Sequence, residues 1–267
     1  MECLPENRIP MLTIRNDQLA LFENATLAQL EEDLVAHLRD GFPVDFELAG
    51  EPALRESVHL AVRRADAYGL ETRGQFCRYM HLAVTFGTHF DRDPLLPWAA
   101  RTLRNPRLAD PDARIDRLEH YALRQLGRVT GETGEVYRKA IIRVRRLDVE
   151  DYCCRPAELE AAMWGLLQQT YPEWYDHAPD AGLREFARIA IDLIGNAGLQ
   201  PDRGALIVPL AMFMLGTHAA EDPLYPWIGG TLNDESFVEP GAREAALISH
   251  AADYVERSLA LIREAGG

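Results

Sequence analysis

The segment GTHFDRDPLLPWAARTL, residues 87–103, returns as GTHAAEDPLYPWIGGTL at residues 216–232, a shift of 129 positions. Without a gap, the same shift aligns residues 53–103 with residues 182–232, and 16 of these 51 positions are identical. Unrelated segments of ordinary composition would share about three. The chain therefore contains an internal duplication, which predicts two copies of one structural unit.

Around the repeated segment, hydrophobic residues recur at three- and four-residue steps, the period of amphipathic helices. In the first copy this pattern predicts helices at residues 17–40, 51–68, 72–87 and 111–126, and a short helix from residue 98. In the second copy it predicts helices at residues 141–149, 156–170, 180–197, 201–215, 227–232 and 240–264, with a kink at Pro209. No alternating strand pattern of convincing length is present. The predicted fold class is all-α.

The duplication also predicts the domain organisation. We expect two tandem homologous helical units of about five helices each, packed with approximate twofold pseudosymmetry. Residues 1–12 are assigned to an N-terminal extension, residues 13–126 to the first unit, residues 127–140 to a linker and residues 141–267 to the second unit. The glycines and threonines of GRVTGETGE, residues 127–135, indicate the connection.

Composition and charge narrow the functional classes. The 267 residues carry a formal net charge of -14, which opposes binding to nucleic acid and to anionic membranes. The N-terminal sequence lacks the features of a signal peptide, and no run of 18 apolar residues occurs. The four cysteines include no CxxC pair, which is typical of reduced thiols. We therefore expect a cytoplasmic protein that binds neither nucleic acid nor membrane.

The repeated turn has a structural interpretation that uses most of its residues. A glycine would end a helix in the left-handed region, an aspartate would cap the turn that a proline starts, and a tryptophan would fill the core. The residues of this turn motif are Gly87, His89, Asp93, Pro94, Pro97 and Trp98 in the first copy and Gly216, His218, Asp222, Pro223, Pro226 and Trp227 in the second.

A metal-dependent site is the competing interpretation of the turn, because His89, Asp91 and Asp93 are residue types that bind divalent cations. The second copy opposes it, since Ala220 stands in the place of Asp91. The ExxH sequence at residues 56–59 has the spacing of di-iron bundles but no second ExxH to complete such a centre. We expect no metal, no cofactor and no catalytic residue.

Four stretches together resemble a known family. They are IRNDQLALFE at residues 14–23, the FP that ends the first helix at residues 42–43, AYGLETRGQFCRYMHL at residues 67–82 and FGTHFDRDPLLPWA at residues 86–99. These stretches resemble an uncharacterised family of bacterial proteins encoded beside type VI secretion spike proteins, PAAR-like tips and their effectors. The resemblance covers one unit of about 115 residues, here present twice, and departs from the family pattern at His89.

The resemblance implies a protein that handles a secreted effector. Such a protein would be an adaptor or co-chaperone that helps to load the effector, or an immunity protein that neutralises it. Its partner would be another protein, namely the effector, its adaptor or the spike. An uncharacterised metal-dependent enzyme using His89, Asp91 and Asp93 is the alternative from a different functional class.

Overall fold

The structure, a computed structural model, describes residues 16–265, and the side chains of residues 27–264. Within that range every regular element is helical, so the predicted all-α fold class is confirmed. The predicted N-terminal extension at residues 1–12 lies outside the described residues.

The first half of the chain forms helices whose bounds follow the predicted ones closely. They are α1 (Asn16–Gly41), α2 (Pro43–Ala49), α3 (Glu51–Ala67), α4 (Arg73–Phe86), the 3-10 turn η1 (Phe90–Arg92), α5 (Pro97–Leu103) and α6 (Pro111–Val129). Local signals explain the boundaries. The Thr72 side chain caps α4 in a capping box with Gln75, and the Asp110 carboxylate accepts hydrogen bonds from the first turn of α6.

The second half repeats much of this order. Its elements are α7 (Glu135–Arg145), η2 (Val149–Tyr152), η3 (Pro156–Glu158), α8 (Leu159–Thr170), α9 (Pro172–His177), α10 (Asp180–Asn196), η4 (Pro201–Arg203), α11 (Ile207–Leu215), η5 (Ala219–Glu221), α12 (Pro226–Asn233) and α13 (Ala242–Ala265). Five of the predicted helices in this half correspond to α8, α10, α11, α12 and α13.

Several predicted boundaries differ from the structure. The short helices α2 and α9 lie in stretches that were left between predicted helices. Pro43 and Pro172 open them, because proline is tolerated in a first turn. Helix α7 begins inside the predicted linker and ends at Arg145, which leaves residues 130–134 as the connection. The predicted kink at Pro209 is wrong, since α11 begins at Ile207 and the proline lies in its first turn.

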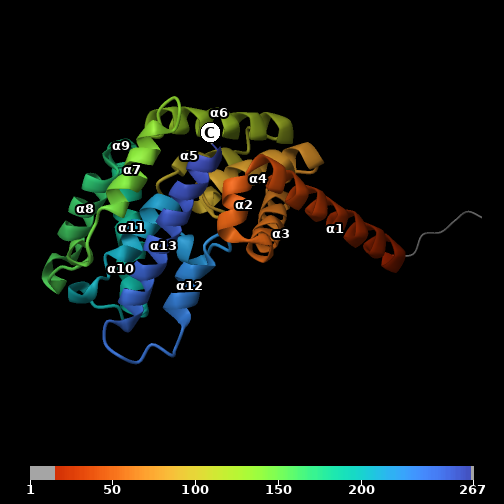
Figure 1. Cartoon of the computed structure of the whole chain (residues 1–267). Coiled ribbons are helices and arrows are strands. Elements are labelled where there is room, and N and C mark those ends of the chain that lie inside the picture. Colours follow the sequence, from red (N-terminus) through yellow and green to blue (C-terminus); the bar gives the residue numbers. More distant parts are fainter. Residues whose placement is uncertain (1–15, 266–267) are drawn as a thin grey trace, which may run out of the picture.

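Two hydrophobic cores form, one in each half. The first lies among α1, α3, α4, α5 and α6, and the second among α8, α10, α11, α12 and α13. In Figure 1 helices α1 to α4 of the first half lie to the right and helices α7 to α11 of the second half to the left, while α6 runs across the top towards α7 and α9. The last long helix of each half contacts a short proline-initiated helix of the other, α13 against α2 and α6 against α9.

A leucine of each repeated turn crosses into the core of the other half. Leu95, which follows the repeated Asp-Pro of the first half, belongs to the core of the second half and is 3% exposed. Leu224, its equivalent 129 residues later, belongs to the core of the first half and is 4% exposed. Because each half completes the core of the other, the two halves fold into one body.

The start of α10 lies directly against the turn of the first half. A Cβ atom at Gly182 would stand 2.3 Å from the Pro94 carbonyl oxygen, whereas one at Gly195, in the same helix, would meet nothing within 4 Å. We expect Gly182→Ala to destabilise the protein by about 1–3 kcal/mol, since backbone must move. Gly195→Ala is the control and should stabilise it by about 0.5–1 kcal/mol. Urea unfolding measures both, and equal effects would contradict the packing.

Candidate functional site

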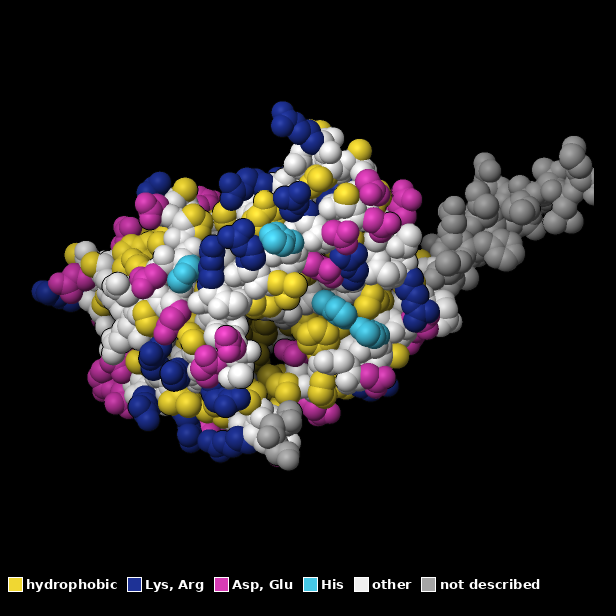
Figure 2. Space-filling model, turned by 90° about the horizontal axis from the view of Figure 1, so that it is seen from above, with side chains coloured by type: hydrophobic (Ala, Val, Ile, Leu, Met, Phe, Trp, Pro, Cys, Tyr) yellow, Lys and Arg dark blue, Asp and Glu magenta, His cyan; other side chains and the backbone are white. Residues whose placement is uncertain are grey.

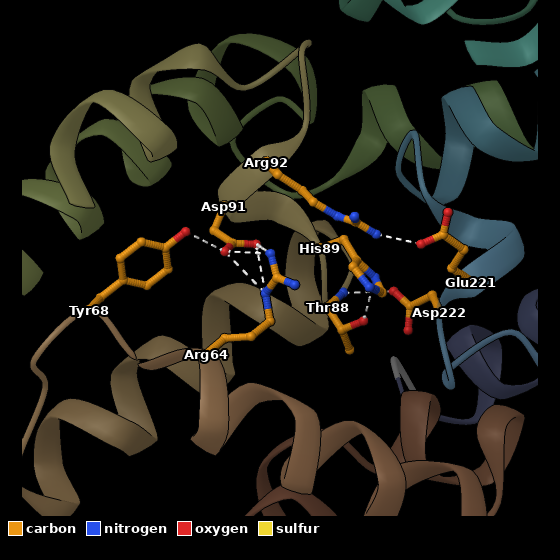
Figure 3. Close-up of polar contacts among 8 residues, drawn as sticks. All are labelled: Arg64, Tyr68, Thr88, His89, Asp91, Arg92, Glu221 and Asp222. Atoms are coloured by element: carbon orange, nitrogen blue, oxygen red, sulfur yellow. Dashed lines mark hydrogen bonds and ion pairs between the residues drawn. The ribbon is translucent and has the colours of Figure 1, made fainter. Parts of the chain in front are cut away.

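The two repeated turns meet each other at the centre of the molecule, as Figure 3 shows in part. The backbone N–H of Thr88 donates to Asp222 Oδ2 at 2.6 Å, and the backbone N–H of Thr217 donates to Asp93 Oδ2 at 2.8 Å. The Thr217 hydroxyl also donates to Asp93 Oδ1 at 2.7 Å. We call this pair of turns, residues 87–97 and 216–226, the central joint.

The glycines that end α4 and α11 allow this close approach. Gly87 has φ and ψ of 90° and 148°, and Gly216 has 111° and 143°. Both glycines have the positive φ that was predicted, but ψ lies in an extended region instead of the left-handed helical one, a combination nearly restricted to glycine. A Cβ at Gly87 would lie 3.0 Å from the Leu215 carbonyl oxygen, and one at Gly216 would lie 2.9 Å from that of Phe86.

Each aspartate of the central joint also shapes its own turn. Asp93 accepts from the backbone N–H of Leu95 at 2.8 Å, and Asp222 accepts from that of Leu224 at 2.9 Å. Burial raises the pKa of both carboxyls, that of Asp222 to about 6, although their hydrogen bonds act in the opposite direction. Pro97 and Pro226 are the first residues of α5 and α12, one residue before the predicted helix starts.

Equivalent positions of the two turns face each other across the central joint. The rings of His89 and His218 have centroids 5.8 Å apart, and Arg92 forms an ion pair with Glu221. Burial, with a smaller contribution from Arg92, lowers the pKa of His89 to about 4 and also lowers that of His218. Burial therefore favours the neutral form of both imidazoles, and Thr88 Oγ1 lies 3.1 Å from His89 Nδ1.

The structure does not assemble the candidate metal ligands of the turn. Within the described residues, the ligand atoms of His89, Asp91 and Asp93 do not converge on one point. Asp91 is 1% exposed, and both of its oxygens accept from the Arg64 guanidinium, at 2.6 Å from one terminal nitrogen. The Tyr68 hydroxyl donates to the same carboxylate at 2.7 Å. The Asp91 carboxylate is thus already hydrogen-bonded by Arg64 and Tyr68, as Figure 3 shows.

The other residues singled out from the sequence take no part in the hydrogen bonds and ion pairs of the central joint. Trp98 and Trp227 are only partly buried and pack against the edges of the two cores. The prediction that they fill the core interior is therefore wrong. Their indole N–H groups are inaccessible and have no hydrogen-bond partner. His59 Nδ1 lies 2.8 Å from Glu31 Oε1 of α1, while Glu56 is exposed on the surface of α3.

A cavity between the halves is the second feature, and sequence reasoning missed it. It has a volume of about 290 Å³, and its walls come from α2, α4, α6, α7, α9, α11 and α13. A smaller pocket of about 120 Å³ shares five of its lining residues, Asp45, Tyr137, Met214, Leu215 and Tyr254. We call the two together the interhalf cavity. The face in Figure 2 is hollowed near its middle, with hydrophobic side chains in the walls.

Asp45 of α2 is the acidic group shared by both parts of the interhalf cavity. Burial raises its pKa to about 6, and the hydrogen bond from its own backbone N–H offsets this shift in part. Around it, burial raises the pKa of Tyr137 to about 12 and the pKa values of Tyr225 and Tyr254 as well. A carboxylate among neutral phenol rings favours a cationic group.

No local signal in the sequence indicated this cavity. Asp45, Tyr137 and Tyr254 stand on helices that are distant in the sequence, and α2 lies in a stretch that was left between predicted helices. The one available signal is the long apolar run of α11, residues 207–215, which is hydrophobic all round and so must be covered by several helices.

Comparisons with known proteins identify no relative of this chain. No family model matches the chain, and it has no match among curated proteins or among solved structures. None of the helices in residues 16–265 has the length and apolar character needed to cross a bilayer.

Proposed function

We propose that this protein acts in the cytoplasm by binding another protein, and that the interhalf cavity receives a basic side chain of that partner. The observation that carries the proposal is the position of Asp45, a carboxylate with a raised pKa in a cavity walled by tyrosine and aliphatic side chains. A lysine or arginine stem would cover the apolar walls, and its charge would pair with the carboxylate.

The overall charge supports a basic partner. A net charge of -14 over 267 residues attracts positively charged surfaces and speeds their association. The cavity lies between the halves, where a bound segment would contact α2 and α4 of one half and α7, α11 and α13 of the other. A bound segment would therefore contact both halves at once.

We also propose that the two halves are related by an approximate twofold axis through the central joint. Three contacts support it. The bond from Thr88 to Asp222 has its counterpart, 129 residues on, in the bond from Thr217 to Asp93. His89 faces its own equivalent, His218, and the exchange of Leu95 and Leu224 between the cores is reciprocal. A twofold contact requires this pattern.

The partner that we propose is a type VI secretion effector, with this protein as its adaptor or co-chaperone. Support comes from the resemblance of residues 14–23, 67–82 and 86–99 described above. An adaptor must release its cargo, so moderate affinity and a single buried charge pair suit it better than a large interface. An immunity protein, which must cover an active site, is the alternative.

Gene deletion and co-expression with the neighbouring effector test the function. If deletion abolishes effector accumulation or export while the cells stay resistant to their siblings, the protein is an adaptor. If deletion makes the cells sensitive to the siblings' effector, it is an immunity protein. If neither phenotype nor a complex is found, and the purified protein turns over a substrate with activity lost in His89→Ala, the binding proposal is wrong.

Asp45→Asn tests the cavity separately. We expect it to weaken partner binding about tenfold or more, because the partner's cation loses its counter-charge. The pKa of Asp45 is higher in the folded state, so its contribution to stability is greatest below about pH 4 and is lost as the pH rises through about 6. The variant should therefore be about 1–2 kcal/mol more stable than wild type at pH 8.

Asp40→Asn is the matched control, since it removes one exposed charge from nearby α1. It should change neither binding nor stability measurably. Calorimetry of the complex and urea unfolding at pH 5 and pH 8 provide the two readouts. If Asp45→Asn and Asp40→Asn bind equally well, the partner does not use the interhalf cavity.

A further inference from the structure

Three side chains of metal-binding type converge on the surface of the first half, away from the central joint. They are His37 of α1 and Cys77 and His81 of α4, and their ligand atoms all lie within 4.8 Å of one another. Within the described residues this is the one group of three or more histidine, cysteine or acidic side chains that meets this geometry. It is distinct from the set of His89, Asp91 and Asp93 weighed above.

The helices produce this convergence. Cys77 and His81 are four residues apart, so they lie on one face of α4, one turn from each other. Helix α1 packs across the same half and brings His37 opposite them. The three residues have different exposures, with His37 exposed and Cys77 and His81 half-buried, so the site is open on its outer side.

Two short contacts join these three side chains. His37 Nε2 lies 2.8 Å from His81 Nε2, and Cys77 Sγ lies 3.6 Å from the same nitrogen. His81 Nε2 has one lone pair or one hydrogen to offer both neighbours. Neither Cys77 nor either imidazole makes a hydrogen bond to any other side chain in the part of the chain described, so no further side chain competes for the three ligand atoms.

We propose that His37, Cys77 and His81 bind Zn²⁺. With Zn–N of about 2.0–2.1 Å and Zn–S of about 2.3 Å, a tetrahedral site has N–N edges of about 3.3 Å and N–S edges of about 3.6 Å. The separation of Cys77 and His81 already equals the second value. The two nitrogens must separate by about 0.5 Å, which the exposed His37 permits.

Two imidazoles and one thiolate suit zinc, a borderline-soft ion, better than magnesium or calcium, which prefer oxygen ligands. The three protein ligands leave a fourth position on the exposed side for water or a side chain of a partner. This proposal departs from the prediction made from the sequence, which was that the protein binds no metal. It does not depend on the proposed protein-binding function.

The test uses the full-length protein, stripped of metal with a chelator and kept reduced with a phosphine, which competes weakly for metal. Cobalt(II) is the probe, because tetrahedral cobalt absorbs strongly in the visible range and a cobalt–thiolate bond adds a charge-transfer band. We expect one equivalent of cobalt to bind with both signals, and one equivalent of zinc to displace it. Protein isolated without chelator should contain zinc by elemental analysis.

Two variants and two controls make the assignment specific. Cys77→Ser should abolish the charge-transfer band, and His37→Gln, at an exposed position where folding is not at risk, should weaken cobalt binding more than tenfold. Cys153→Ser and His177→Gln, which alter residues outside the site, should leave it unchanged. Absence of a thiolate band in the wild type, or its survival in Cys77→Ser, would overturn the proposal.

Discussion

Replacing Asp93 with alanine is expected to lower the free energy of unfolding by about 3–5 kcal/mol. The carboxylate accepts three hydrogen bonds, from the backbone of Leu95 and from the backbone and hydroxyl of Thr217. Hydrogen bonds to a charged acceptor contribute about 1.5–3 kcal/mol each, and their donors would stay buried without a partner. The relief of burying one carboxylate offsets part of this loss.

The effect should reveal that the bond joins the two halves. A double-mutant cycle between Asp93→Ala and Thr217→Val should give a coupling of about 1–2 kcal/mol, because the Thr217 hydroxyl donates to Asp93. Asp222→Ala should cost less than Asp93→Ala, since Asp222 accepts from two backbone N–H groups, those of Thr88 and Leu224.

Urea unfolding followed by circular dichroism measures these differences. Asp176→Ala is the control, at an exposed position at the end of α9, and should change stability by less than about 0.5 kcal/mol. If Asp93→Ala were as mild as this control, the central joint would not hold the halves together.

Arg64→Leu is expected to destabilise the protein by a similar amount, about 3–5 kcal/mol. Asp91 is 1% exposed, and the guanidinium of Arg64 is the only cation that the structure places on it among the described residues. Removing the arginine would leave a buried carboxylate with a single donor, the hydroxyl of Tyr68. Such an uncompensated charge is far more costly than the absence of both partners.

The duplication supplies the compensating change. The positions 129 residues after Arg64 and Asp91 hold Leu193 and Ala220, so the second half has an apolar pair where the first has an ion pair. The double variant Arg64→Leu with Asp91→Ala should therefore recover most of the loss, to within about 1–2 kcal/mol of wild type. Thermal unfolding of the single and double variants checks this, and additive losses would contradict it.

Helices with a strong repeating pattern could be predicted from the sequence, and the short ones could not. Helices α3, α6 and α10 have a hydrophobic stripe and clear end signals, so their bounds fall within a few residues of the prediction. Helices α2 and α9 have seven and six residues and no buried side chain, so no stripe marks them. Their opening prolines indicate a break and a helix start equally well.

The candidate sites show the same division. The turn motif was visible because its residues are contiguous and occur twice. Its role as the central joint was not visible, since the partners of Thr88 and Asp93 lie 134 and 124 residues away. The sequence shows that the second copy has no counterpart of Asp91. The reason became clear only in the structure, where Asp91 pairs with Arg64 of α3, which also has no counterpart in the second copy.

By itself the sequence determined the helical class, the duplication, the positions of most long helices and the two turns, because hydrophobic period, glycine and proline act over a few residues. Only the tertiary structure decided that Leu95 and Leu224 exchange cores, that Asp45 faces tyrosines of the other half, and that His37 approaches Cys77. These contacts depend on how whole helices pack, and packing is set by the combined surfaces of segments far apart in the chain.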